Sequence, residues 1–225
     1  MLTILIGRAK TGKSDTMLRR MAELGESSQQ ILLVPEHASH QAEVDVCRAC
    51  GDTASRHAEV LSFRRLSERV LSITGGIADV TLDNGGKLLT LQRALLETAP
   101  QMTVYRKPSQ KVGFLEQMLA LFDELRSYEV TPEILYQQAQ DIDGATHDKL
   151  TDLSLLYAAY EARLRRPGLD ARDRMTKLCE VLESSRYAFG KDVFVDGFTY
   201  FNAQERQVLE SIRRQARSVT VTLLG

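Results

Sequence analysis

Residues 7–14 restrict the fold more than any other part of the chain. They read G-R-A-K-T-G-K-S, which fits the phosphate-binding pattern G-x-x-x-x-G-K-S. The short apolar run 2–6 comes just before them, and an amphipathic helical pattern over 14–24 follows. A strand, a loop and a helix in this order are the setting in which such a loop binds nucleotide phosphates. The sequence therefore predicts a P-loop at the end of a buried first strand.

Each part of this loop has an expected role in binding ATP and Mg²⁺. Its glycines allow the tight turn that points consecutive backbone N–H groups at one anion. Lys13 is expected to reach the β- and γ-phosphates, and the Ser14 hydroxyl to hold the Mg²⁺ ion. The expected nucleotide-binding residues are Gly7, Arg8, Ala9, Lys10, Thr11, Gly12, Lys13 and Ser14. The plain alternative is a strand-to-helix turn that carries a solvated lysine.

Strand and helix patterns alternate at both ends of the chain, whereas 85–164 shows only helical spacing of its apolar residues. The expected strands are 2–6, 31–34, 60–63, 192–196 and 219–223. This order predicts an α/β fold, with a P-loop NTPase parallel sheet and an all-helical insertion. We place the core at 1–80 and 168–225 and the insertion at 81–167. Because a buried last strand needs further chain to cover it, we expect a fragment of a longer protein, unless that strand is an edge.

Asp196, at the end of the fourth expected strand, is predicted to complete the phosphate site. P-loop enzymes hold Mg²⁺ with such a residue, so Asp196 and Ser14 would share the ion. An ordinary turn is the alternative, because Asp196-Gly197 is a strong turn pair. Helicase-like motors carry a water-orienting Glu where Gly197 stands, and Glu205 is the next acid. We therefore expect nucleotide binding without efficient hydrolysis, and that Gly197→Glu would change hydrolysis more than loss of Glu205.

Basic and aromatic residues follow two of the expected strands. Aromatic rings can stack bases and arginines can contact phosphates, so these residues fit single-stranded DNA. Two alternatives fit equally well: the residues after the third strand could form a solvated basic helix face, and the aromatic residues after the fourth could lie in the core or in a lid. The residues are Phe63, Arg64, Arg65, Arg69, Phe198, Tyr200 and Phe201.

Composition limits the partners and the location. The formal net charge is −1, so DNA contacts must come from local groups rather than an overall positive field. No apolar run approaches the roughly 20 residues of a membrane span, and no signal peptide is recognisable. We expect a cytoplasmic protein without membrane contact. Cys47 and Cys50 are expected to pack on one helix face, although a redox pair or half a zinc site shares their spacing.

Five segments, in order, resemble the N-terminal part of the AddB family, the B subunits of the bacterial ATP-dependent helicase–exonuclease. They are G-R-A-K-T-G-K-S at 7–14, L-L-V-P-E-H-A-S-H-Q at 32–41, V-L-S-F-R-R-L-S-E-R-V at 60–70, L-T-D-L-S-L-L-Y-A-A-Y at 150–160 and V-D-G-F-T-Y-F-N-A-Q-E at 195–205. The resemblance implies a superfamily-1-like helicase fold with a degenerate motor. It also implies an AddA-like partner in a heterodimer that processes DNA double-strand ends for recombinational repair and scans one strand for a hotspot. A nuclease and an iron–sulfur cluster are expected only near the far C-terminus of the longer protein.

The same resemblance assigns DNA contacts to individual residues. By motif match, the residues that would face the scanned strand are His37, Ser39, Phe63, Arg65 and Phe201. Where the family usually reads Pro-Glu-Gln-x-Thr-Phe-Gln, this chain reads P-E-H-A-S-H-Q at 35–41. The chain also has no room before the P-loop for the glutamine motif with which active relatives read adenine. The changed segment bears on which DNA sequence would be read, and the missing glutamine motif bears on how fast ATP would be used.

Three functions therefore compete. The first is a motor-like domain of a DNA-end-processing subunit that binds Mg²⁺–ATP and single-stranded DNA. The second is a stand-alone P-loop nucleotide or metabolite kinase whose insertion is a lid, for which Arg163, Arg165 and Arg166 are a weak match to phosphate-binding lid arginines. The third is a protein-interaction module with a vestigial P-loop.

Overall fold

The computed structural model describes residues 1–75, 82–106, 113–166, 169–170 and 173–225. These form two compact units, a core unit of Met1–Ile77 with Arg174–Gly225 and a helical unit of Ala78–Asp173. The division predicted from the sequence, at 80/81 and 167/168, lies outside the described residues. In the described part of the chain, no helix is long and apolar enough to span a bilayer.

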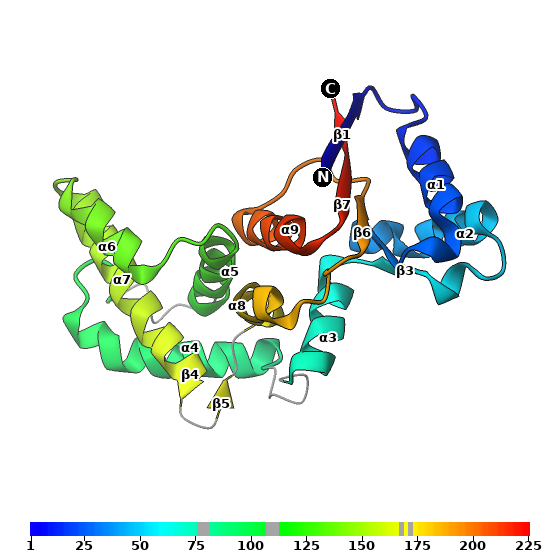
Figure 1. Cartoon of the computed structure of the whole chain (residues 1–225). Helices are drawn as coiled ribbons and strands as arrows, with labels where there is room; N and C mark the ends of the chain where they lie inside the picture. The colour runs from blue at the N-terminus through cyan, green and yellow to red at the C-terminus, as the bar shows by residue number, and fades with distance from the viewer. Residues whose placement is uncertain (76–81, 107–112, 167–168, 171–172) are drawn as a thin grey trace. The chain divides into compact units, whose positions relative to one another are not determined.

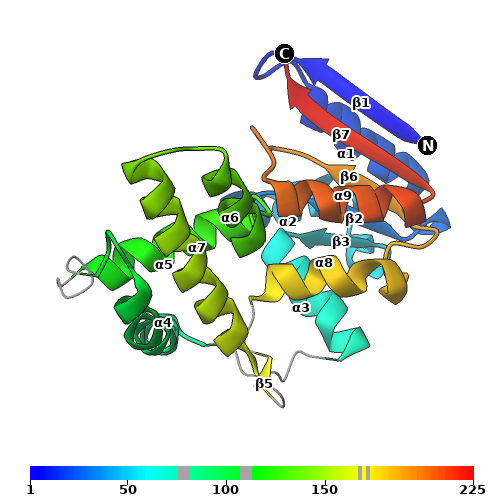
Figure 2. The ribbon, with the colours of Figure 1, turned by 90° about the vertical axis from the view of Figure 1, so that its left-hand side faces the viewer.

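The core unit contains a parallel sheet with the strand order β1-β7-β6-β2-β3 (Figures 1 and 2). Its strands are β1 (Leu2–Gly7), β2 (Gln30–Leu33), β3 (Ala58–Leu61), β6 (Asp192–Val195) and β7 (Ser218–Leu224). Its helices are α1 (Lys13–Leu24), α2 (Ser39–Cys50), α3 (Phe63–Thr74), α8 (Arg174–Ser185) and α9 (Ala203–Gln215), with short 3₁₀ turns η1 (Gly25–Ser27), η2 (Glu36–Ala38) and η3 (Ala54–Arg56). The α/β fold predicted from the alternating patterns is confirmed.

Both faces of the central strands are buried, because alternate side chains of a strand point to opposite sides. Ile31 and Leu33 of β2 pack with apolar residues of α3, α8 and α9. Leu32 and Val34 pack on the other side with Met17 and other residues of α1 and α2. The sheet is therefore the middle of three layers, which explains why 31–34 is apolar throughout.

The first and the last strand of the chain differ from the sequence prediction. The run 2–6 was expected to be buried, but β1 is the edge strand and pairs only with β7 among the described strands. One of its faces is open, with Ile6 68% exposed. The run 219–223, whose alternative was an edge strand, forms β7 between β1 and β6. Strand order depends on contacts between distant segments, so the local apolar pattern did not determine it.

The helical unit is built from α4 (Asn84–Thr98), η4 (Ala99–Gln101), α5 (Phe114–Ser127), α6 (Pro132–Gln140) and α7 (Ala145–Leu164), followed by the short antiparallel pair β4 (Arg165–Arg166) and β5 (Leu169–Asp170). In its core the Phe122 ring stacks on Tyr157 with centroids 4.6 Å apart. Asp152 of α7 is buried and accepts hydrogen bonds from three consecutive backbone N–H groups, at 103–105. Its carboxylate therefore fastens the segment after η4 to α7.

Candidate functional site

The loop between β1 and α1 folds back on its own backbone. Lys13 Nζ donates hydrogen bonds to the Gly7 carbonyl oxygen at 2.6 Å and to that of Arg8 at 2.7 Å. The Thr11 hydroxyl also donates to the Arg8 oxygen, at 2.8 Å. A Cβ atom at position 7 would lie 2.8 Å from the Thr11 Oγ1 atom, so only glycine allows the chain to cross itself this closely.

The first turn of α1 is open to a ligand. Gly12 is its N-cap residue, with φ of 80°, and no described side chain accepts a hydrogen bond from the first N–H groups of the helix. These N–H groups and the helix dipole favour an anion. Lys13, the first residue of α1, is held only by neutral carbonyls that a phosphate can replace. The geometry therefore suits an anion with more than one oxygen.

Asp196 follows β6 and is fixed by its neighbours on both sides. Its N–H donates to the Leu33 oxygen at 3.0 Å, and its Oδ1 atom accepts a hydrogen bond from the Thr222 hydroxyl of β7. No described residue donates to the other carboxylate oxygen, Oδ2. Thr222 is buried, so this contact orients the carboxylate from the sheet itself.

Ser14 and Asp196 line the same small cavity, of about 160 Å³. One carboxylate and one hydroxyl suit Mg²⁺, which keeps several waters and completes its octahedron with phosphate oxygens. Gln41 and Asp45 of α2 line this cavity too, with Gln41 Nε2 donating to Asp45 Oδ1 at 2.8 Å. Sequence reasoning missed this pair, although its i,i+4 spacing on the helix that follows β2 was a usable signal.

Metal sites built from protein ligands alone are absent from the described residues, which bring no three His, Cys, Asp or Glu side chains together for an ion. Cys47 is exposed and Cys50 is half-buried, and both are free thiols. Burial, followed by the neighbouring Cys47, raises the pKa of Cys50 above its usual value. Cys50 packs against the core cluster of α1 and α2, as expected, but the exposed Cys47 does not, so the prediction of two packed thiols is wrong for Cys47. The raised pKa makes Cys50 a poor nucleophile and a poor ligand.

The two positions weighed for a water-orienting acid are both unsuitable in this structure. Gly197 has φ of 79°, and a Cβ atom there would lie 3.3 Å from Pro35 Cδ. Glu205 belongs to a capping box at the start of α9: its carboxylate accepts from the Asn202 N–H, while the Asn202 side chain accepts from the Glu205 N–H. Neither position therefore directs a carboxylate at the cavity of Ser14 and Asp196.

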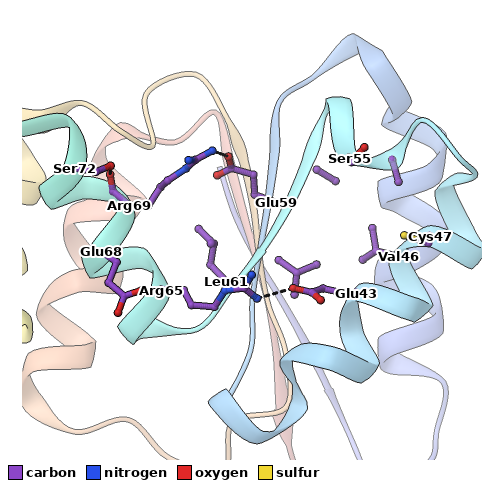
Figure 3. A pocket seen from close by; sticks show the side chains of 13 residues that line it. Glu43, Val46, Cys47, Ser55, Glu59, Leu61, Arg65, Glu68, Arg69 and Ser72 are labelled. Carbon is purple, nitrogen blue, oxygen red and sulfur yellow. Dashed lines mark hydrogen bonds and ion pairs between the residues drawn. The ribbon is translucent and has the colours of Figure 1, made fainter. Parts of the chain in front are cut away.

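The arginines expected to meet DNA phosphates each pair with a carboxylate (Figure 3). Arg65 contacts Glu43 of α2 at 2.5 Å, and Arg69 contacts Glu59 of β3 at 2.7 Å. These pairs line a cavity of about 710 Å³ along the open edge of β3, between α2 and α3. The third arginine, Arg64, pairs with Glu36 and Glu68. Their charges are therefore largely compensated within the protein.

The five residues assigned to DNA by resemblance differ in accessibility. His37 is exposed and Ser39 is buried. Phe63 is 7% exposed, its ring packed edge-on against Phe198 at 5.4 Å, and half-buried Phe201 also contacts Phe198. Arg65 is in the ion pair with Glu43. Among the aromatic residues after Asp196, Tyr200 is the most exposed, and no motif match had selected it.

Comparisons with known proteins agree on one family. A family model described as "ADDB, N-terminal" matches residues 4–225. The chain belongs to the AddB N-terminal family. Similar proteins, each named as the B subunit of an "ATP-dependent helicase/deoxyribonuclease", include those of Desulforamulus reducens (37% identical), Thermoanaerobacter sp. (33%) and Clostridioides difficile (32%). Each alignment covers 99% of this chain and 20% of the relative, so this AddB-type chain spans one fifth of their length.

Proposed function

We propose that this chain is the N-terminal, motor-like domain of a DNA double-strand-end-processing helicase/exonuclease subunit, and that it binds Mg²⁺–ATP without efficient hydrolysis. One observation carries the proposal: Ser14 and Asp196 share a cavity beside a folded P-loop, while Gly197 and Glu205 direct no acid into it. Family membership favours this function over a stand-alone kinase. The lid arginines of the kinase hypothesis also have other partners, since Arg163 pairs with Glu97.

Nucleotide binding would proceed by exchange of partners within the loop. Lys13 would leave the Gly7 and Arg8 carbonyls for the β- and γ-phosphates, and the open N–H groups of α1 would bind the remaining oxygens. Ser14 and the free Oδ2 atom of Asp196 would hold Mg²⁺, which supplies positive charge against the phosphates. Because neither Gly197 nor Glu205 directs an acid at the cavity to orient water, the bound nucleotide would turn over slowly and would stabilise the fold.

In the whole protein, we propose an AddA-like partner subunit that carries the active motor. The complex would act in recombinational repair and scan a single strand of a processed DNA end for a hotspot. His37, Ser39, Phe63, Arg65 and Phe201 remain the proposed contacts by resemblance. The exposed His37 would meet DNA first, whereas Phe63 and Arg65 would need a rearrangement to reach it.

Lys13→Met tests the nucleotide site, with Lys149→Met as its matched control. Both changes remove one ammonium, but Lys149 is exposed on α7, outside the phosphate-binding loop, and makes no side-chain hydrogen bond among the described residues. Charge-assisted hydrogen bonds are worth about 1.5–3 kcal/mol, so Lys13→Met should weaken Mg²⁺–ATP binding at least about tenfold. Thermal stabilisation by Mg²⁺–ATP measures this. Equal stabilisation of the parent and both variants would contradict the assignment.

A further inference from the structure

A second cavity lies wholly within the helical unit, between α6 and α7. Its volume is about 610 Å³, within the range of small-ligand sites. Its polar lining residues come from three elements: Gln101 of η4, Glu133, Tyr136 and Gln137 of α6, and Thr151 and Ser154 of α7. Neither the P-loop nor the DNA contacts assigned by resemblance involve these residues.

The floor of this cavity contains polar groups with unused hydrogen-bonding capacity. The Thr151 hydroxyl is buried and has no hydrogen-bond partner among the described residues. Ser154 is buried beside it and donates to the Thr151 carbonyl oxygen at 2.8 Å, which leaves the Ser154 oxygen free to accept. The Thr151 oxygen itself is enclosed by protein, so the hydroxyl that a ligand could reach on this side of the cavity is that of Ser154.

The side chains around the opening are neutral hydrogen-bonding groups and one carboxylate. Gln101 and Gln137 make no side-chain hydrogen bond with the described residues, so both primary amides are available. A hydrogen bond from Thr131 holds the pKa of Glu133 below its usual range, so this group is an anion at neutral pH. Among the described residues that line the cavity there is no Lys, Arg or His, so the lining disfavours phosphate.

These groups match the requirements of an unpaired nucleobase. Primary amides can form paired hydrogen bonds with base edges, and a carboxylate accepts from an exocyclic amine. The Tyr136 ring is 52% exposed and can stack on a base. Pro132, Leu155 and Ala158 supply the apolar part of the lining, against which the flat face of a base can pack. The sugar and phosphates of the ligand would stay in solvent.

We propose that the α6–α7 cavity binds one unstacked base of a single-stranded DNA. Hydrogen bonds from Gln101 and Gln137 would hold the base edge, and Tyr136 would cover its face. The site would contact the base, and other parts of the protein would contact the sugar–phosphate backbone of the DNA. It operates without nucleotide at the P-loop, so the two proposals can fail separately.

The test measures binding of the full chain, without ATP, to a short single-stranded oligonucleotide that carries 2-aminopurine. Tyr136→Ala should weaken binding at least about fivefold, because removing an aromatic ring on which one base stacks lowers the affinity by at least that factor. Tyr136→Phe keeps the ring and should retain most of the affinity. Tyr128→Ala is the matched control, because Tyr128 is 50% exposed in the same unit but does not line the cavity.

Two further arms decide whether a base or the backbone is bound. An oligonucleotide of equal length with abasic residues keeps every phosphate, and its weaker binding should not respond to Tyr136→Ala. Gln137→Ala should weaken binding of the base-containing strand and leave the abasic strand unchanged. Equal effects of Tyr136→Ala and Tyr128→Ala, an equal Tyr136→Ala effect on both strands, or no binding of the base-containing strand would overturn the proposal.

Discussion

The P-loop and the first turns of α3 both carry cations that the sequence assigned to phosphates, yet the protein holds them differently. Lys13 is bound by two backbone carbonyls. Arg64, Arg65 and Arg69 are each bound by at least one carboxylate. A phosphate can replace neutral carbonyls at small cost, but it must compete with a full negative charge at each arginine.

This difference separates a site prepared for an anion from one whose charges are already neutralised. The loop of residues 7–14 would gain a stronger partner if a phosphate entered. The arginines of α3 gain little unless their carboxylates move or are protonated. Motif and composition cannot tell the two cases apart, because the acids lie on other elements: Glu43 on α2 and Glu59 on β3.

The largest effect is expected at Gly197, where the sequence suggested that one substitution could restore hydrolysis. Glu at this position would adopt a left-handed φ and press on Pro35, so Gly197→Glu should lower the free energy of unfolding by about 2 kcal/mol. Its hydrolysis should stay near that of the parent. Gly190→Glu is the control, because Gly190 shares a positive φ but meets no atom within 4 Å of a Cβ.

Urea unfolding and phosphate release measure the two parts of this prediction. A Gly197→Glu variant that is as stable as the parent and turns over ATP rapidly would show that the loop after β6 accepts an acid. In that case the proposed nucleotide site would lack only one side chain for hydrolysis.

A smaller effect is expected when Arg65 is released from its acid. Glu43→Gln keeps the shape of the side chain but removes the charge that holds Arg65. If Arg65 then contacts a phosphate, the slope of log affinity against log salt for single-stranded DNA should steepen by about 0.7. Glu26→Gln, at an exposed position, changes the net charge equally and is the control. Identical slopes for both variants would exclude Arg65 from DNA contact.

The smallest effect concerns Glu36, which Arg64 and Ser62 contact. Their hydrogen bonds, that of Arg64 first, hold the pKa of Glu36 below its ordinary 4.5. The folded pKa is the lower one, so the stabilisation is present above pH 4.5 and is lost as the pH falls through the folded value. Because the pair is exposed, Glu36→Gln should cost under about 1 kcal/mol at pH 7 and nothing in acid. A pH-independent difference in unfolding free energy would rule out this ion pair.

Local patterns predicted the strands and the order of elements well, but not how far each strand is buried. The run 31–34 is apolar at every position and is buried on both faces. The run 2–6 looks similar, yet β1 is an edge, because its neighbours come from the far end of the chain. The third strand was expected at 60–63, but β3 ends at Leu61, and Ser62 is the N-cap of α3 that accepts from the Arg65 N–H.

The candidate site was only partly predictable. Ser14 and Asp196 could be paired from the sequence, because parallel strands bring their carboxyl ends to one sheet edge. The capping role of Glu205 was also readable, since Asn202 and Glu205 have the capping-box spacing. The Thr222 contact that orients Asp196 depends on the neighbouring strand and left no local signal.

The most direct test of a nucleotide site without turnover measures Mg²⁺–ATP binding and phosphate release on the same sample of the chain. We expect saturable binding with turnover far below the roughly 1 s⁻¹ at the low end of ordinary enzymes, because neither Gly197 nor Glu205 directs an acid at the cavity to orient water. Several turnovers per second by the chain alone, or no detectable nucleotide binding, would contradict this expectation.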